Sequence, residues 1–146
     1  MQGNARVALY GMGYMRDSRL YRMMVTPGEV TWNTPSDTPE IPADSWFNLF
    51  FIHQNHAPRG SKNAVSEKLL PPWLHFVVWG HEHACKVEPQ ISAEGGGHFS
   101  VSQPGSSVPT TLSEDEAIPK KVFLLEARLA PPFGISLKRA PPSATR

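Results

Sequence analysis

Residues 74–83 read LHFVVWGHEH, an apolar run followed by a glycine and two histidines, His81 and His83. The run 74–79 has the composition of a strand buried on both faces, as in the interior of a parallel sheet. Residues 46–52 form a second run of this kind, which leads directly into a third histidine, His53. The two runs predict two buried strands, each with a histidine at or just beyond its carboxyl end.

The segment between the two runs predicts that these strands are parallel. It is about 20 residues long, which is enough for a crossover connection, and residues 66–70 within it are a short helical candidate stopped by Pro71 and Pro72. Parallel neighbours joined by a right-handed crossover end at the same edge, where α/β sheets bind ligands. Since side chains alternate along an extended chain, we expect His81 and His83 to face one side and Glu82 the other. The three imidazoles of His53, His81 and His83 are therefore expected to converge.

Three converging imidazoles are candidate metal ligands, with ordinary loop or capping histidines as the alternative. Neutral imidazoles alone suit one zinc ion with an open fourth position. A manganese or dinuclear centre also needs carboxylates, because harder cations prefer oxygen and two neighbouring cations need anionic bridges. Glu82 is expected to face away, and Glu88, Glu94 and Asp115 do not follow the buried strands. If the centre is dinuclear, its carboxylates are not expected in this chain.

The remaining segments complete an α/β or α+β pattern dominated by strands. A helix is expected from Asp17 to about Met24, capped by Asp17 or Ser18. Residues 26–44, rich in proline and small polar residues, are expected to form a surface excursion. The further strands are expected at 6–10, 86–88, 98–103, 121–129 and 134–138.

Composition bounds the class of protein. The chain has 146 residues and a formal net charge of +1, so no whole-chain charge signature points to nucleic acid. The single cysteine, Cys85, excludes an internal disulfide framework and is expected to be a small packed residue. No apolar stretch reaches the roughly 18 residues of a membrane span. These features predict one globular domain with a core of its own.

Five segments, in this order, carry a resemblance to a known family. They are VALYG (7–11), RLYRM (19–23), SWFNLF with IHQN (45–55), VWGHEH (78–83) and SQPGSS (102–107). Together they resemble the calcineurin-like metallophosphoesterases, and among these the SbcD-like nuclease subunit of the eukaryotic double-strand-break repair complex. The resemblance covers roughly residues 5–130, and the joint occurrence of these motifs is highly specific.

The resemblance implies a fold, a domain organisation and a ligand set. The implied fold is α/β, the C-terminal half of a two-sheet metallophosphoesterase sandwich flanked by helices. Residues 1–130 would be a partial nuclease domain without its N-terminal half, and 131–146 a Pro-rich linker or the start of a following DNA-binding or capping region. His53, His81 and His83 match family histidines that ligate two manganese ions, His83 on one ion and the other two on its neighbour. The family's Asp-x-His, Gly-Asp and Gly-Asn-His motifs are not found here, so no catalytic proton donor is expected in this chain.

The implied activity is manganese-dependent hydrolysis of DNA, by an exonuclease or endonuclease of double-strand-break repair, homologous recombination and meiosis. The implied partners are DNA, the SMC-like repair ATPase, the regulatory subunit of the complex and a second copy of the nuclease, in the nucleus and with no membrane. Two alternatives stay open: an inactive fragment that only binds DNA or a partner, and a single-zinc hydrolase built on the three histidines. One tightly bound zinc ion would favour the second alternative, and the absence of metal the first.

The loop after His53 is a candidate DNA contact. Asn55, His56, Arg59 and Lys62 lie in it, next to the expected metal edge, where donors can meet phosphate. The alternative is a solvated polar loop. Ser106, in the QPGSS segment, is a further candidate, with a plain turn as its alternative.

Overall fold

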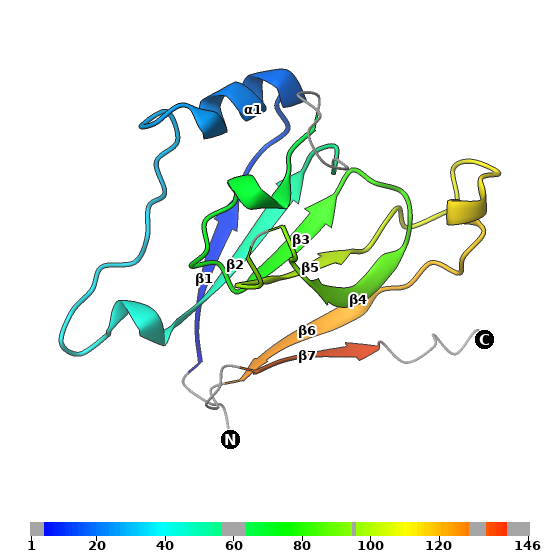
Figure 1. Cartoon of the computed structure of the whole chain (residues 1–146). Helices are drawn as coiled ribbons and strands as arrows, with labels where there is room; N and C mark the ends of the chain where they lie inside the picture. The colour runs from blue at the N-terminus through cyan, green and yellow to red at the C-terminus, as the bar shows by residue number, and fades with distance from the viewer. Residues whose placement is uncertain (1–4, 57–63, 95, 129–133, 140–146) are drawn as a thin grey trace.

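A computed structural model describes residues 5–56, 64–94, 96–128 and 134–139. In this part of the chain a five-stranded sheet has the order β1-β2-β3-β5-β4, and a two-stranded sheet pairs β6 with β7 (Figure 1). The strands are β1 (Arg6–Gly11), β2 (Trp46–His53), β3 (Phe76–Gly80), β4 (Lys86–Ile91), β5 (Ser100–Gln103), β6 (Phe123–Arg128) and β7 (Gly134–Arg139). The predicted α/β class is confirmed.

The central strands are parallel, as the crossover length predicted. β1 pairs with β2, β2 with β3 and β3 with β5 in parallel, and among the described strands of this sheet only β4 runs antiparallel, along β5. In Figure 1 the arrowheads of β1, β2 and β3 therefore point to the same edge of the sheet. The register sets His53, the last residue of β2, opposite Gly80, the last residue of β3. This shared edge is the place to look for a site.

The helical part of the described chain is small. It comprises α1 (Asp17–Val25) and the 3₁₀ turns η1 (Ala43–Ser45), η2 (Glu67–Leu69) and η3 (Glu114–Glu116). The predicted capping of α1 by Asp17 or Ser18 is wrong, since Arg16 holds the cap position without a side-chain hydrogen bond. The Asp17 carboxylate instead accepts hydrogen bonds from the backbone N–H and the side-chain amide of Asn55, the latter at 2.7 Å. Among the described helices, none has the length and apolar character needed to cross a membrane.

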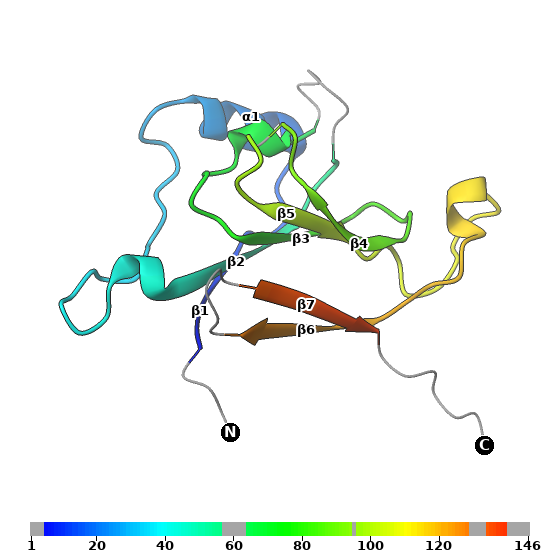
Figure 2. The ribbon, with the colours of Figure 1, turned by 60° about the horizontal axis from the view of Figure 1, so that its bottom comes forward.

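The sheet has two differently covered faces. On one face, Phe50, Ile52, Val77 and Trp79 form the main core with Leu20 of α1. On the other face, a smaller cluster of Phe47, Leu49 and Phe76 packs against Leu125 of β6. Figure 2 shows α1 above the large sheet and the β6–β7 pair below it. The fold is thus layered around β2 and β3, the two strands that lead to the histidines.

Burial follows the predicted pattern with one exception. Residues 47–50 and Ile52 of β2 are buried, but Phe51 is 44% exposed. Phe51 follows Phe47 and Leu49 at every second position and so lies on the face of the smaller core, but it is not part of that cluster. The predicted surface excursion at 26–44 is largely exposed, although Trp32 within it packs against the main core. Cys85 is buried, as expected of a small packed residue.

Candidate metal centre

His53 and His81 come together at the carboxyl edge of the sheet. Their ring centroids are 5.2 Å apart and the rings are nearly perpendicular, at 80°. Two imidazoles that bind one cation through nitrogens about 2.1 Å from it place their ring centres roughly 5 Å apart. Among the described residues, none donates to or accepts from either ring. The pair therefore has the spacing and the free nitrogens of two ligands to one cation.

Gly80 makes room for this pair. A Cβ at position 80 would lie 2.8 Å from Nδ1 of His53, closer than side-chain carbons approach such atoms. An open hollow of about 460 Å³ lies beside the pair. It is lined by Gly11, Met12, Gly13, Phe51, Ile52, His53, Val78 and Gly80. The glycine at the end of β3 thus has a steric role in placing the His53 ring.

The chain leaves the extended conformation at His81, so the predicted alternation of residues 81–83 is wrong. β3 ends at Gly80, and His81 has a φ of +84°, a left-handed value that non-glycine residues rarely adopt. Such a conformation costs about 1–3 kcal/mol and persists only where the surroundings impose it. Glu82 accepts a hydrogen bond from the backbone N–H of His56, and His83 lies in irregular chain rather than in a strand.

His83 lies against a buried carboxylate that the sequence did not indicate. Its Nδ1 is 3.0 Å from Oε1 of Glu116 and 2.7 Å from the Thr110 hydroxyl. The His83 side chain is 51% exposed, whereas that of Glu116 is only 3% exposed. Glu116 lies in η3, 33 residues further along the chain. No local pattern could have linked the two residues, since a long loop brings them together.

The Glu116 carboxylate is held ionised by its surroundings. The Thr110 backbone N–H donates to Oε2 and, against the opposing effect of burial, lowers the pKa of Glu116 to about 2. Hydrogen bonds from His83 and from the hydroxyls of Thr110 and Thr111 act in the same direction. The Lys120 ammonium is 3.9 Å from Oε2 and donates to the His83 carbonyl at 2.7 Å. The loop at 110–120 therefore wraps a carboxylate that faces His83.

The QPGSS turn packs against the backbone of His83. Gly105 has a φ of +77°, and a Cβ there would lie 2.6 Å from the His83 carbonyl oxygen. The Ser106 N–H donates to the same oxygen at 3.4 Å. The Ser106 hydroxyl is buried, with no partner among the described residues. The turn fixes the main chain at His83, and the Ser106 hydroxyl is not on the surface.

His56 is enclosed by protein partners. Its ring stacks on the buried Trp79 indole with centroids 4.1 Å apart, and its Nε2 is 2.9 Å from Glu67 Oε1. Its Nδ1 is 3.3 Å from Gln103 Oε1. Burial lowers the pKa of His56, but the hydrogen bonds to Glu67 and Gln103 and the charges of Glu67 and Glu82 raise it more, so the pKa is raised. Arg59 and Lys62, the other basic candidates of this loop, lie outside the described residues.

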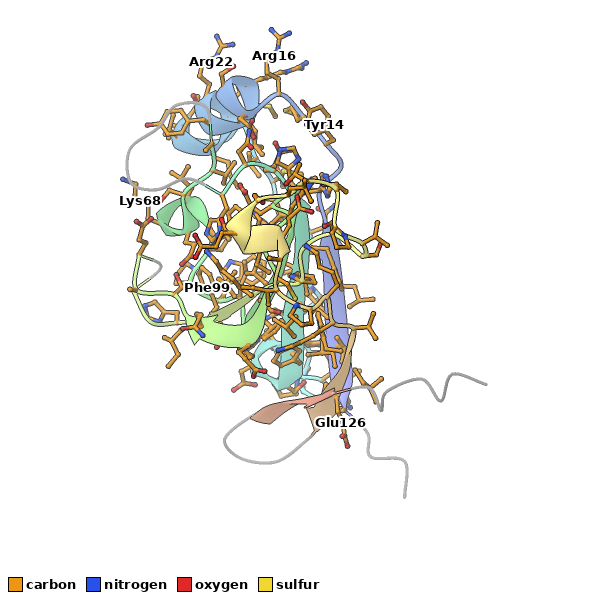
Figure 3. All side chains as sticks on the ribbon, turned by 90° about the vertical axis from the view of Figure 1, so that its right-hand side faces the viewer. Tyr14, Arg16, Arg22, Lys68, Phe99 and Glu126 are labelled. Atoms are coloured by element: carbon orange, nitrogen blue, oxygen red, sulfur yellow. The ribbon has the colours of Figure 1, made fainter. Side chains whose placement is uncertain are left out.

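A basic surface that was not expected from the sequence lies on α1. Arg16, Arg19 and Arg22 are exposed and spaced by three residues, so they share one side of the helix. Figure 3 shows Arg16 and Arg22 pointing away from the rest of the fold. The bond between Asp17 and Asn55 joins the start of α1 to the chain just after His53. The three-residue spacing was the signal that could have revealed this surface.

The donor set at this edge fits part of a metal centre. His53 and His81 offer two free imidazoles at a suitable spacing, and His83 follows two residues later. Within the described residues, however, no three His, Cys, Asp or Glu residues form a group that could hold a metal ion. A complete centre therefore needs ligands beyond those that the described residues gather.

The sequence is similar to curated proteins of one kind. No family model matches the chain. It is 47% identical over 128 residues to the double-strand break repair protein MRE11 of Arabidopsis thaliana, which covers 87% of this chain and 17% of that protein. It is 46% identical to MRE11 of Oryza sativa subsp. japonica and 45% identical to that of Homo sapiens, each over 127 residues and 87% of this chain. The aligned stretch makes up 18% of the rice protein and 17% of the human protein. The chain spans less than a fifth of the length of each of these three relatives. The identities show that the chain belongs to the MRE11 family of double-strand break repair proteins.

Proposed function

We propose that this chain supplies the imidazole part of the metal centre of a DNA nuclease that acts in double-strand-break repair. The observation that carries the proposal is the His53–His81 pair, with ring centroids 5.2 Å apart at the carboxyl edge of parallel strands. Its location agrees with the ligand-binding edge of α/β sheets. The similarity to MRE11 proteins and the metallophosphoesterase motifs both support this class of reaction.

We propose manganese as the metal, two ions in the complete domain, with His53 and His81 on one ion and His83 on the other. A bound divalent cation would lower the pKa of a water molecule and offset the charge that develops on a phosphodiester. The chain's own part is to hold nitrogen lone pairs in place: Gly80 leaves space for the His53 ring, and the backbone at His81 turns its imidazole towards it. The single-zinc alternative has less support, because the described residues hold no group of three ligands.

We also propose that the surface around this edge contacts DNA. The exposed arginines of α1 are the basic side chains that the described structure offers next to the loop after β2. Asn55, Arg59 and Lys62 remain proposals from the sequence. So do His56, whose two ring nitrogens already face protein partners, and Ser106, whose hydroxyl is buried in this structure. Phosphate contacts of this kind position a nucleic acid without reading its sequence.

The family resemblance extends the proposal to the cellular setting. We propose a nuclear protein of homologous recombination and meiosis that acts as an exonuclease or endonuclease. It would act with an SMC-like repair ATPase, a regulatory subunit and a second nuclease copy. By itself the 146-residue chain is expected to cleave DNA slowly or not at all, since the described residues gather no group of three His, Cys, Asp or Glu residues that could hold a metal ion. Rapid manganese-dependent cleavage by the purified chain, lost in His81→Ala, would show that expectation to be wrong.

A chimera tests the nuclease proposal directly. The matching segment of the Arabidopsis thaliana relative is replaced by this chain, and cleavage of linear duplex DNA is measured with manganese. We expect the chimera to cleave DNA and His81→Ala to slow cleavage by at least about 100-fold, because a lost ligand removes the charge-stabilising cation. His98→Ala is the matched control, since His98 lies on the exposed turn between β4 and β5. Equal cleavage by the His81→Ala and His98→Ala chimeras would refute the role of His81.

A further inference from the structure

His83 and Glu116 form a contact whose chemistry sets the proton position on the imidazole. Nδ1 of His83 is 3.0 Å from Oε1 of Glu116, whose side chain is 3% exposed. An ionised carboxylate has only acceptor oxygens, so the imidazole nitrogen that faces it carries hydrogen. The Thr110 hydroxyl, 2.7 Å from the same nitrogen, is 3.0 Å from Glu116 Oε1 and can donate to it, which leaves its own lone pairs free to accept from Nδ1. Both neighbours therefore favour the Nδ1–H form of His83.

The opposite nitrogen of His83 is then a lone-pair donor. In a neutral imidazole with hydrogen on Nδ1, Nε2 is free to bind a cation. The described residues place no hydrogen-bond partner at Nε2, and half of the His83 side chain is exposed. Carboxylates that take the other N–H of a metal-bound histidine fix its tautomer and orientation in many metal sites.

The rest of the loop keeps the carboxylate in place. The backbone N–H groups of Thr110 and Thr111 donate to Oε2 of Glu116, at 2.5 and 3.4 Å. This leaves Oε1 turned towards the imidazole. The His83 main chain is held independently, by Lys120 and by the turn at Gly105. Ring and backbone are therefore fixed from two sides by groups far away in the sequence.

We propose that Glu116 is a positioning residue that holds His83 as the Nδ1–H tautomer, with Nε2 presented to a divalent cation. This inference rests on the proposed metal centre and adds to it a residue that touches neither metal nor substrate. In this proposal the loop at 110–120 serves to bury the Glu116 carboxylate next to His83, a proposed metal ligand.

Replacing Glu116 by glutamine tests the proposal with little change in shape. The two backbone N–H groups at Oε2 require the amide oxygen, so the NH₂ group of the new side chain would face Nδ1 of His83. A donor at that position favours the Nε2–H tautomer, which removes the lone pair from Nε2. Asp115→Asn is the matched control, because it makes the same acid-to-amide change at the exposed neighbouring position.

The first readout needs no metal. Long-range ¹H–¹⁵N spectra of the metal-free 146-residue chain at neutral pH report which His83 nitrogen carries hydrogen. We expect Nδ1–H in the wild type and in Asp115→Asn, and Nε2–H in Glu116→Gln. An Nε2–H form in the wild type overturns the proposal, whether or not the variant folds.

The second readout is the affinity for Mn²⁺ alone, followed by paramagnetic broadening of the histidine signals. We expect Glu116→Gln to lower the Mn²⁺ affinity measured from the His83 signal by about 10- to 100-fold. Asp115→Asn should leave this affinity unchanged. Equal affinity of Glu116→Gln and the wild type overturns the role of Glu116 but leaves the metal centre standing. A wild-type chain in which Mn²⁺ broadens none of His53, His81 and His83 overturns the proposed centre and this inference with it.

Discussion

Two pairs of aromatic rings at the same edge of the sheet illustrate two uses of histidine. In the pair of His56 and Trp79, the imidazole stacks on a fully buried indole, and both of its nitrogens face protein partners. In the pair of His53 and His81, the rings meet edge to face, and the described residues offer neither ring a hydrogen bond. The first pair is a satisfied polar network in the core, and the second has unused nitrogens beside an open hollow.

The difference shows that a position near the carboxyl edge of the sheet does not by itself leave the ring nitrogens of a histidine free. A buried polar group is stable where its hydrogen-bonding capacity is met, as at His56. The imidazoles of His53 and His81 have no such hydrogen bonds among the described residues, and the backbone at His81 is strained. Strain and unused nitrogens together are typical of a functional site rather than of a stabilising one. The two pairs should therefore respond in opposite ways to substitution.

The largest expected effect is at the core pair. Trp79→Ala should lower the free energy of unfolding by about 3–5 kcal/mol, because a fully buried indole leaves a cavity. His53→Ala should change it by no more than about 0.5 kcal/mol, as at other exposed positions. Denaturant unfolding followed by circular dichroism measures both. A loss at His53→Ala comparable to that at Trp79→Ala would mean that His53 has a structural role too.

His56→Phe should have the next largest effect. The substitution keeps a ring over Trp79 but leaves Glu67 and Gln103 without their imidazole partner, which costs about 1–3 kcal/mol for buried polar groups.

The pH dependence of the free energy of unfolding tests the charges of His56 and Glu67 more specifically than the substitution alone. Because the pKa of His56 is raised above 6.5, its stabilisation is complete below pH 6.5 and is lost as the pH rises through the folded-state value. The hydrogen bond from His56 is the main cause that lowers the pKa of Glu67 below 4.5. The stabilisation that ionised Glu67 contributes is therefore present above pH 4.5 and is lost as the pH falls through the folded-state pKa.

This pair should therefore stabilise the fold most between pH 4.5 and 6.5. Burial lowers the pKa of His75, which acts in the opposite direction by reducing stability below pH 6.5. Comparing wild type with His56→Phe across the pH range isolates the contribution of His56. If the two stability curves run parallel from pH 6 to 8, the charge of His56 does not stabilise the fold.

The smallest expected effect has the opposite sign. His81→Gly should raise the free energy of unfolding by about 1 kcal/mol, because glycine adopts a positive φ without steric cost. The same substitution should remove the metal response at His53. His81→Ala, which keeps the steric cost but loses the imidazole, separates the two effects. A destabilised His81→Gly chain would show that the ring stabilises the fold by more than its backbone strain costs.

The sequence predicted the parts of this edge that depend on local pattern. The apolar runs that became β2 and β3, their parallel pairing and the meeting of His53 with His81 all follow from strand composition and connection length. The contact between His83 and Glu116 could not be predicted, because it depends on how the loop at 110–120 folds back. The same holds for Asp17, whose carboxylate bonds to Asn55 across 38 positions instead of capping its own helix. The positive φ of His81 could not be predicted from the sequence either, because the neighbouring Gly80 is the residue that adopts such a φ more readily.

Titration of the 146-residue chain with Mn²⁺, followed by histidine side-chain NMR, tests most directly whether the His53–His81 pair is a ligand site. The rings of His53 and His81 should broaden first, at concentrations that leave His56 and the exposed His98 sharp. Broadening that begins at His56 or His98, or that affects all six histidines equally, would contradict the assignment of the pair as metal ligands.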